Sequence, residues 1–254
     1  ASAVLAGCGS GDTNEADFSI TALDGYIVNG LVTTTCGDKV FTGYTNSLGV
    51  APIVAYGLDI TGCASIVEGV TGTYDTDQPD VPWTGAMATL PGLAVINPFT
   101  DIAVTLSQVP GNESLSTEEL KNKVLELLGY DDNHPSAAVL FEDFGATSTR
   151  DLSDNAETAL LAQAVFDTKI QLLAELAESA ATENTRAVSY YTFTADQVIA
   201  FYGAVLPKVT GAVAAAVKEI LDGNGDASGY TIKLNIPQSI MADVIDAIGA
   251  IDDA

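Results

Sequence analysis

The chain has 254 residues, of which 34 are acidic and 9 basic, so its formal net charge is −25. This excess of acids excludes a nucleic-acid binder, because binding to a phosphate backbone requires a basic surface. It also disfavours docking on an anionic membrane through charge. Aliphatic and aromatic residues make up 47% of the chain, enough for a sizeable core, so the protein is not a disordered acidic tail.

The first residues resemble the end of a bacterial lipoprotein signal peptide. Leu5-Ala6-Gly7-Cys8 is similar to a lipobox, and the polar residues 9–15 that follow are typical of a flexible tether. The resemblance implies cleavage before Cys8 and lipid on that residue, which would hold the protein at a membrane. If residues 1–7 are retained instead, we expect this apolar segment to pack on a neighbouring subunit by strand addition. No apolar run approaches the ~18–20 residues that cross a bilayer, so we predict no transmembrane helix.

Residues 17 to about 109 have the pattern of a β structure. Short alternating segments recur about every ten residues and are separated by Gly-rich turns, which is typical of an antiparallel β-sandwich. The segments with this pattern are 18–23, 26–32, 40–45, 51–56, 64–70 and 83–89. Residues 75–82 are predicted to form a loop, because the two prolines cannot donate hydrogen bonds within a sheet.

Cys36 and Cys63 flank predicted strands and are the natural disulfide pair in an oxidising compartment. Cys8 is then left for lipid or for an intermolecular bond. The alternative is that Cys36 and Cys63 are two buried free thiols. Zinc is not expected, because the chain contains no CxxC pair.

After Pro110 the pattern becomes helical. Ser116 and Glu119 form a capping box, and the apolar face that follows ends at Gly129. Two longer helices are predicted from about residue 153 and from Thr194, and Pro207 should kink or split the second. A late strand at 230–236 and a helix from Pro237 complete the chain. We therefore predict the α+β class, with an N-terminal segment and tether (1–16), an antiparallel β-sandwich domain (17–110) and an acidic, mainly helical domain (111–254).

Three segments of the β half resemble a module found in surface lipoproteins of Gram-negative bacteria. They are Ile20 to Val32, which contains Asp24-Gly25-Tyr26-Ile27-Val28-Asn29-Gly30, then Gly43 to Gly49, and Val95 to Ile102. The modules are similar to carboxypeptidase-regulatory or immunoglobulin-like sandwiches. The resemblance covers about residues 17–130 and implies a surface-exposed protein without a catalytic role. The chain lacks the Asp- and Asn-rich run that such modules often carry after the first strand, so no calcium site is implied there.

Few residues are candidates for site chemistry. His134 is the only histidine and lies in an acidic turn, so we expect no hydrolase triad and no enzyme. Asp222, Asn224 and Asp226 alternate along a Gly-rich loop in the way that calcium ligands do. Ala227 and Lys233 do not fit a full EF-hand, so a simple helix cap and turn explains this loop equally well. Asp75, Asp77 and Asp80 are a weaker calcium candidate, and Trp83 could form an exposed platform for a sugar.

Two hypotheses on function follow. The first is a non-enzymatic, exported structural or adhesive protein that self-associates into a homo-oligomer or filament through its N-terminal segment, with calcium as a candidate cofactor. The second is a monomeric outer-membrane lipoprotein that binds a ligand such as a carbohydrate. Both place the protein at the cell surface, at the outer membrane or outside the cell.

Overall fold

The computed structural model describes residues 17–130, 137, 139–145, 157–170 and 195–222. Within these residues the class is α+β, because short strands come first and helices follow, as the sequence predicted. The strands are β1 (Phe18–Ala22), β2 (Ile27–Val28), β3 (Leu31–Cys36), β4 (Lys39–Tyr44), β5 (Val50–Ile53), β6 (Ala64–Glu68), β7 (Tyr74–Asp75), β8 (Gln78–Pro82), β9 (Ala86–Thr89) and β10 (Val95–Ile96). The labelled helices are α1 (Pro98–Ser107), α2 (Thr117–Leu128) and α4 (Ala195–Leu221), and residues 157–170 are also helical.

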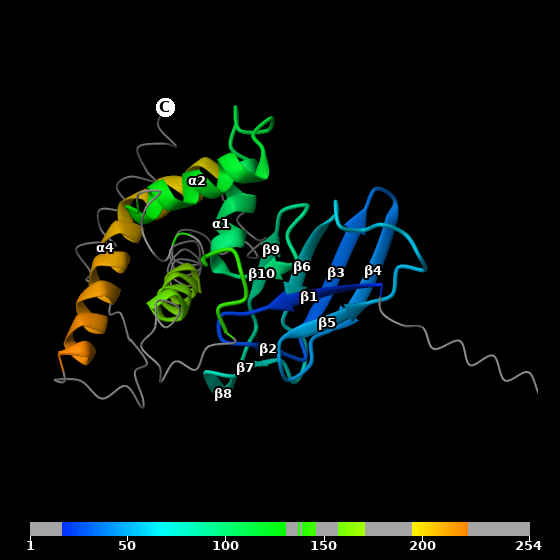
Figure 1. Ribbon diagram of the computed structural model, residues 1–254, viewed down its shortest axis with the longest axis horizontal. Coiled ribbons are helices and arrows are strands. Elements are labelled where there is room, and N and C mark those ends of the chain that lie inside the picture. Colours follow the sequence, from blue (N-terminus) through cyan, green and yellow to red (C-terminus); the bar gives the residue numbers. More distant parts are fainter. Residues whose placement is uncertain (1–16, 131–136, 138, 146–156, 171–194, 223–254) are drawn as a thin grey trace, which may run out of the picture.

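The strands form three small sheets, in the orders β10-β1-β5, β2-β7-β8 and β4-β3-β6-β9. Most neighbours are antiparallel, but β10 pairs with β1 in parallel, with Thr21 opposite Val95 and Ala22 opposite Ile96. The sheets lie on one side of the molecule and α1, α2 and α4 on the other (Figure 1). The β pattern therefore ends at β10, earlier than the sequence predicted, because α1 occupies residues 98–107.

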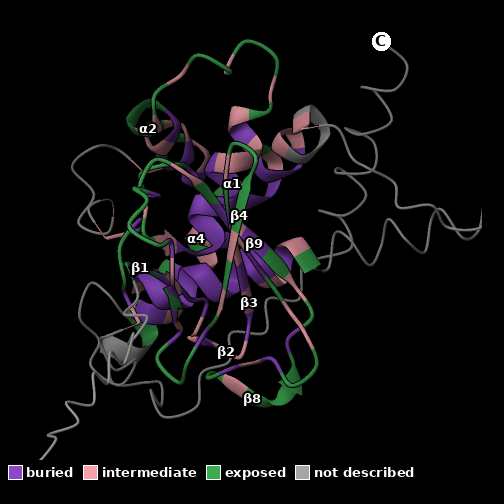
Figure 2. Cartoon of the chain, turned by 90° about the vertical axis from the view of Figure 1, so that its right-hand side faces the viewer, coloured by how far each residue is buried: buried purple, intermediate pink, exposed green. Residues whose placement is uncertain are grey.

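The predicted loop at residues 75–82 is wrong, because residues 78–82 form strand β8. β8 pairs with β7 at Tyr74–Pro82 and Asp75–Gln78 and lies at the edge of its sheet. An edge strand has one set of backbone groups facing solvent, so Pro79 and Pro82 are tolerated there without a donor. Exposure along most of β8 agrees with this position (Figure 2).

Two apolar cores support these elements. The first is built by β strands from different sheets, and includes Ile20 and Ile53 from one sheet and Val32 and Val67 from another. The second is built mainly by helices, and joins α1, α2, α4 and residues 157–165. The two cores interlock, because Leu23 from the β half lies in the helical core and Phe166 from a helix lies in the β core.

Helix α1 begins at a buried N-cap, Asn97, whose side chain accepts hydrogen bonds from the backbone of Phe99 and Thr100. Its first turn also covers the outer edge of β9. The backbone N–H of Ala88 donates to Oδ1 of Asp101, and the hydroxyl of Thr100 donates to the carbonyl of Ala88. The outer edge of β9 is therefore protected from pairing with another strand at this position.

Helix α2 begins at the predicted capping box. Ser116 accepts from the backbone of Glu119, and the Glu119 carboxylate accepts from the backbone of Ser116. The helix ends at Gly129, which has a φ of 77°. The predicted apolar face is confirmed for Leu120, Val124 and Leu128, which are buried.

Helix α4 is continuous through Pro207, so the predicted split does not occur. Proline removes the hydrogen bond to the carbonyl four residues earlier, which belongs to Gly203. Gly203 and Pro207 are both exposed, so water can satisfy this carbonyl. One stretch of α4, Ile199–Glu219, is by length and composition apolar enough to cross a membrane, which the sequence analysis missed. Its buried residues pack in the helical core, and the core helix of a soluble protein meets the same criterion.

Candidate functional site

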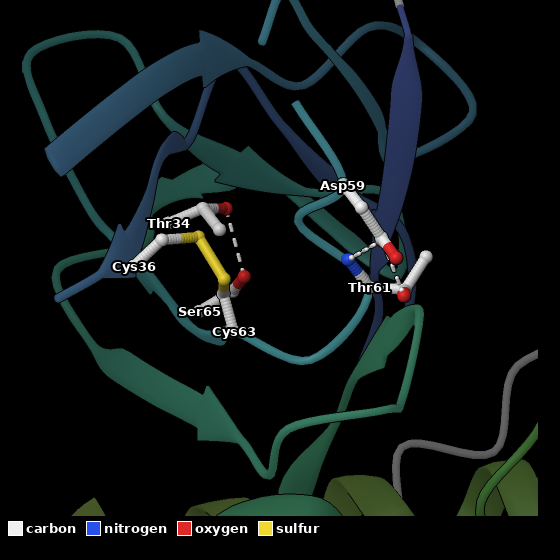
Figure 3. The surroundings of a disulfide bond; sticks show 6 residues. All are labelled: Thr34, Cys36, Asp59, Thr61, Cys63 and Ser65. Carbon is white, nitrogen blue, oxygen red and sulfur yellow. Dashed lines mark hydrogen bonds between the residues drawn. A yellow bond between two sulfur atoms is a disulfide. The ribbon is translucent and has the colours of Figure 1, made fainter. Parts of the chain in front are cut away.

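The Cys36–Cys63 disulfide expected from the sequence is present, with Cα atoms 5.1 Å apart. It joins the end of β3 to the residue before β6, two strands that pair directly. The hydroxyls of Thr34 and Ser65, opposite each other in this pairing, are 2.8 Å apart beside it (Figure 3). The loop that the disulfide closes is further ordered by Asp59, which accepts from the backbone and hydroxyl of Thr61.

The predicted calcium loop is only partly described. Asp222 is exposed at the end of α4 and forms an ion pair with Lys218, one turn earlier on the same helix. Asn224 and Asp226 lie outside the described residues, as do Cys8 and His134. Among the residues that the structure describes, no group of three or more acidic, histidine or cysteine side chains is placed to hold a metal ion.

A cavity of about 250 Å³ lies between strands β7 and β8 and the helix of residues 157–170. One part of its wall is acidic and is formed by Asp24, Asp75 and Asp167. The rest is mainly apolar and comes from β8, the residues after it and the helix. These wall residues are Val81, Pro82, Trp83, Phe166 and Ile170. We call this feature the acidic cavity.

The turn that carries Asp24 is fixed by contacts with a distant part of the chain. Leu23 and Tyr26 form a bridge across the turn. The backbone N–H of Tyr26 donates to the hydroxyl of Thr76, and the N–H of Thr76 donates to the carbonyl of Tyr26. A side chain at Gly25 would overlap Asp75 and Thr76, so only glycine allows this close approach. The turn therefore holds Asp24 and Asp75 against the same cavity.

The carboxyl group of Asp24 is almost fully buried, at 3% exposure. Its Oδ1 atom has no hydrogen-bond partner among the described residues. Burial raises the pKa of this carboxyl well above its ordinary value, and the nearby charges of Asp75 and Asp167 raise it further. Burying a carboxylate without a partner is costly, so Asp24 needs either a proton or an added donor.

Asp75 is also buried, and burial raises its pKa to about 6. Its carboxylate accepts hydrogen bonds from the backbone of Asp77 and Gly25, which lower the pKa and offset part of this effect. Asp167, on the helix, is half-buried, and partial burial raises its pKa. Neighbouring carboxylates thus raise the pKa values of Asp24 and Asp75, and a positive charge in the cavity would offset this repulsion.

The apolar part of the acidic cavity contains two stacked rings. Trp83 and Phe166 have centroids 5.5 Å apart and an interplanar angle of 16°. They pack directly over Gly85, where a Cβ atom would overlap the ring of Phe166. Trp83 is buried at 6% exposure, so the expectation of an exposed platform for a sugar is wrong. Ile170, on the same helix as Phe166, is 40% exposed at the cavity.

Two residues of this site, Asp75 and Trp83, were singled out for ligand chemistry from the sequence. Asp75 lines the cavity, but Asp80 of the same predicted cluster is exposed on β8 and does not. The Asp24-Gly25 pair signals a turn, yet nothing local shows that the turn docks on Thr76. Asp167 lies on the polar side of a helical pattern, so it looked like an ordinary solvated residue.

Comparison of the chain with protein-family models, with curated proteins and with solved structures finds no significant match.

Proposed function

We propose that the protein is a non-enzymatic, exported protein of the cell surface, the outer membrane or the extracellular space, where it acts in structure or adhesion by associating with copies of itself. The Cys36–Cys63 disulfide carries this proposal. Disulfides persist in oxidising compartments and are rare in the cytosol, so the bond supports export. The lipobox-like residues that end at Cys8 support the same route.

The edge of the four-stranded sheet supports association through strand addition. β4 ends this sheet, and no described strand pairs with its outer edge. Val40 and Tyr44 on β4 are 61% and 57% exposed, although both are large and apolar. An exposed apolar edge strand is a template for pairing with another chain. The opposite edge, β9, is covered by Asp101 and Thr100, so the two edges are not equivalent.

We propose that the added strand is the apolar N-terminal segment, residues 1–7, of a neighbouring copy. Such a contact joins two different surfaces, so it is open-ended and produces filaments unless the rotation closes a ring. A net charge of −25 per chain opposes this packing. Assembly is therefore expected to depend on salt or on a divalent ion such as calcium.

The proposal also includes the fold type of the β half, a sandwich of two packed sheets. The sheets that contain β1 and β3 place Ile20, Ile53, Val32 and Val67 in one core. This arrangement supports a sandwich of the carboxypeptidase-regulatory or immunoglobulin-like type, as the family resemblance implied. The resemblance implies a module without a catalytic role.

The test uses the native protein, alkylated before cell lysis. Peptide mapping is expected to show Cys36 linked to Cys63, and electron microscopy is expected to show polymers that retain residues 1–7. The variant Val40→Lys should block strand addition and abolish polymers. The control variant Leu48→Lys, at an exposed residue in the turn after β4, should leave the polymers intact. Reduced cysteines, or polymers unaffected by Val40→Lys, would overturn the proposal.

The acidic cavity favours a second candidate function, a monomeric lipoprotein held at the outer membrane by Cys8 that binds a small ligand. Small-ligand sites are typically concave, mainly apolar and supplied with a few polar groups, as this cavity is. Lipid on Cys8 together with single particles would favour this candidate over the first. Mass spectrometry of the native N-terminal peptide distinguishes the two.

A further inference from the structure

We propose that the acidic cavity binds a primary ammonium group on an aliphatic stem, the group that a lysine side chain and a free alkyl diamine share. This inference deepens the ligand-binding candidate above and rests on it for the role of the cavity. It joins the buried, unpartnered carboxyl of Asp24 to the apolar wall beside it.

The first step concerns the missing hydrogen-bond donor at the buried carboxyl group of Asp24. Its Oδ1 atom is buried without a hydrogen-bond donor, and Asp24 is one of the residues that line the cavity. Asp75 and Asp167 line the same cavity from a strand and from a helix. No lysine, arginine or histidine is among the described residues of the wall. A ligand that pairs with the ionised carboxyl of Asp24 must therefore supply positive charge or hydrogen-bond donors.

The second step separates an organic cation from a metal ion. Calcium requires six to eight oxygen ligands at about 2.3–2.6 Å. Within the described part of the chain, the carboxylates are not grouped closely enough to provide even three acidic ligands for one ion. A bare ion would also leave the apolar wall of Val81, Pro82 and Phe166 without a contact. An organic cation can pair with the acidic part of the wall and pack its carbon chain on the apolar part.

The third step is the match of shape and chemistry. An alkylammonium group has three donors, of which one can reach Asp24, while Asp75 and Asp167 add negative charge to the same wall. Its stem can lie along Val81 and Ile170, which are 54% and 40% exposed and lead towards solvent. The aromatic rings of the wall favour a cation electrostatically. A volume of about 250 Å³ is below the ~300–1,000 Å³ of pockets for drug-sized ligands, so the cavity suits a group the size of one side chain.

The test is calorimetric titration of the full chain with two probes, cadaverine and Nα-acetyl-lysine methylamide, at low salt and pH 7.5. Both contain the proposed group, and tighter binding of the second would identify a polypeptide lysine as the source. Tighter binding of cadaverine would identify a free diamine. 1,5-Pentanediol, which has the same length without charge, is not expected to bind.

Substitutions test whether the carboxylates of Asp24 and Asp167 bind the amines. Asp24→Asn is expected to weaken binding of the amines by about tenfold or more, the loss typical of a hydrogen bond to a charged group. Asp167→Asn, at a half-buried helical position that tolerates the change, should also weaken binding. Asp80→Asn is the matched control, because this carboxylate is exposed on β8 outside the cavity. Circular dichroism confirms that each variant is folded.

Three results would overturn the inference. The first is amine binding that Asp24→Asn and Asp167→Asn leave unchanged. The second is calcium binding that depends on Asp24 in the absence of amine binding. The third is a neutral sugar that binds through Asp24 when the amines do not, which would leave the ligand-binding candidate standing. If no probe of any class binds, the inference and that candidate fail together.

Discussion

The Nζ atom of Lys169 lies 2.6 Å from Oδ2 of Asp101 and also donates to the carbonyl of Ala86. One side chain on the helix of residues 157–170 thus contacts α1 and β9 together. The side chains of Lys169 and Asp101 are 25% and 12% exposed, so this ion pair is largely shielded from water.

Replacing Lys169 with methionine is expected to lower the free energy of unfolding by about 2–3 kcal/mol. The variant leaves the shielded carboxylate of Asp101 without its cation, and such a loss costs about 3–5 kcal/mol where burial is complete. Urea unfolding measures the difference. Lys218→Met is the control, because its ion pair with Asp222 is exposed and should contribute less than about 1 kcal/mol. Equal effects of the two variants would contradict the structural role of Lys169.

The Cys36–Cys63 bond should stabilise the fold strongly, because it closes a loop of 27 residues in the unfolded chain. The chain-entropy model gives about 3–4 kcal/mol for a loop of this size. The double variant Cys36→Ser, Cys63→Ser is expected to lose that amount in urea unfolding. Reduction of the wild-type protein should have the same effect, and no effect on the double variant. A loss below about 1 kcal/mol would show that the bond adds little to this fold.

The acidic cavity predicts that the protein gains stability on mild acidification. Burial raises the pKa of Asp75 to about 6, whereas an aspartate in an unfolded chain titrates near ~3.9. The folded protein therefore binds protons more tightly between these values. The free energy of unfolding should rise as the pH falls from about 7 to about 4, and Asp75 should account for up to about 3 kcal/mol.

The measurement is urea unfolding at pH 7.5 and pH 4.5. Asp75→Asn should be more stable than wild type at pH 7.5 and should show a smaller gain on acidification, because asparagine keeps the hydrogen-bond acceptor and loses the charge. Asp24 should add to the effect in the same direction, since burial also raises its pKa. The prediction is wrong if wild type and Asp75→Asn respond identically to pH.

A substitution at Gly85 tests the packing of the apolar wall of the acidic cavity. A Cβ atom there would overlap Phe166 and crowd Trp83, so Gly85→Ala must displace one of the stacked rings. Overpacking of this kind costs about 1–3 kcal/mol. The matched control is Gly62→Ala, because no atom lies within 4 Å of a Cβ placed at Gly62. Thermal unfolding of the two variants should therefore diverge, and the tryptophan fluorescence of Gly85→Ala should shift.

Local patterns predicted the local features of this fold. The capping box at Ser116 and Glu119 and the stop at Gly129 depend on residues a few positions apart, so they could be read directly from the sequence. The pairing of Cys36 with Cys63 could be predicted because both flank predicted strands, which leaves Cys8 for lipid or an intermolecular bond. Asn97, which caps α1 while donating to the carbonyl of Leu140, was missed because residues 17 to about 109 were all interpreted as β structure.

The acidic cavity depends instead on contacts between distant segments. Asp24 is buried only because its turn docks on Thr76, and Asp167 reaches the cavity only because Phe166 packs in the β core. Neither contact produces a periodic pattern of polar and apolar residues in the sequence. Pro79 and Pro82 were misleading for a related reason, since their cost depends on whether the strand lies at an edge, which the sheet order decides.

The parallel pairing of β10 with β1 has a consequence for how the chain matures. Thr21 cannot pair with Val95 until almost the whole β-rich part has been synthesised. Until then β1 has only β5 as a partner, and its other edge remains open to misplaced neighbours. Contacts so far apart in the chain form slowly. A chaperone that shields the early strands would therefore benefit this protein most before β10 is available for pairing.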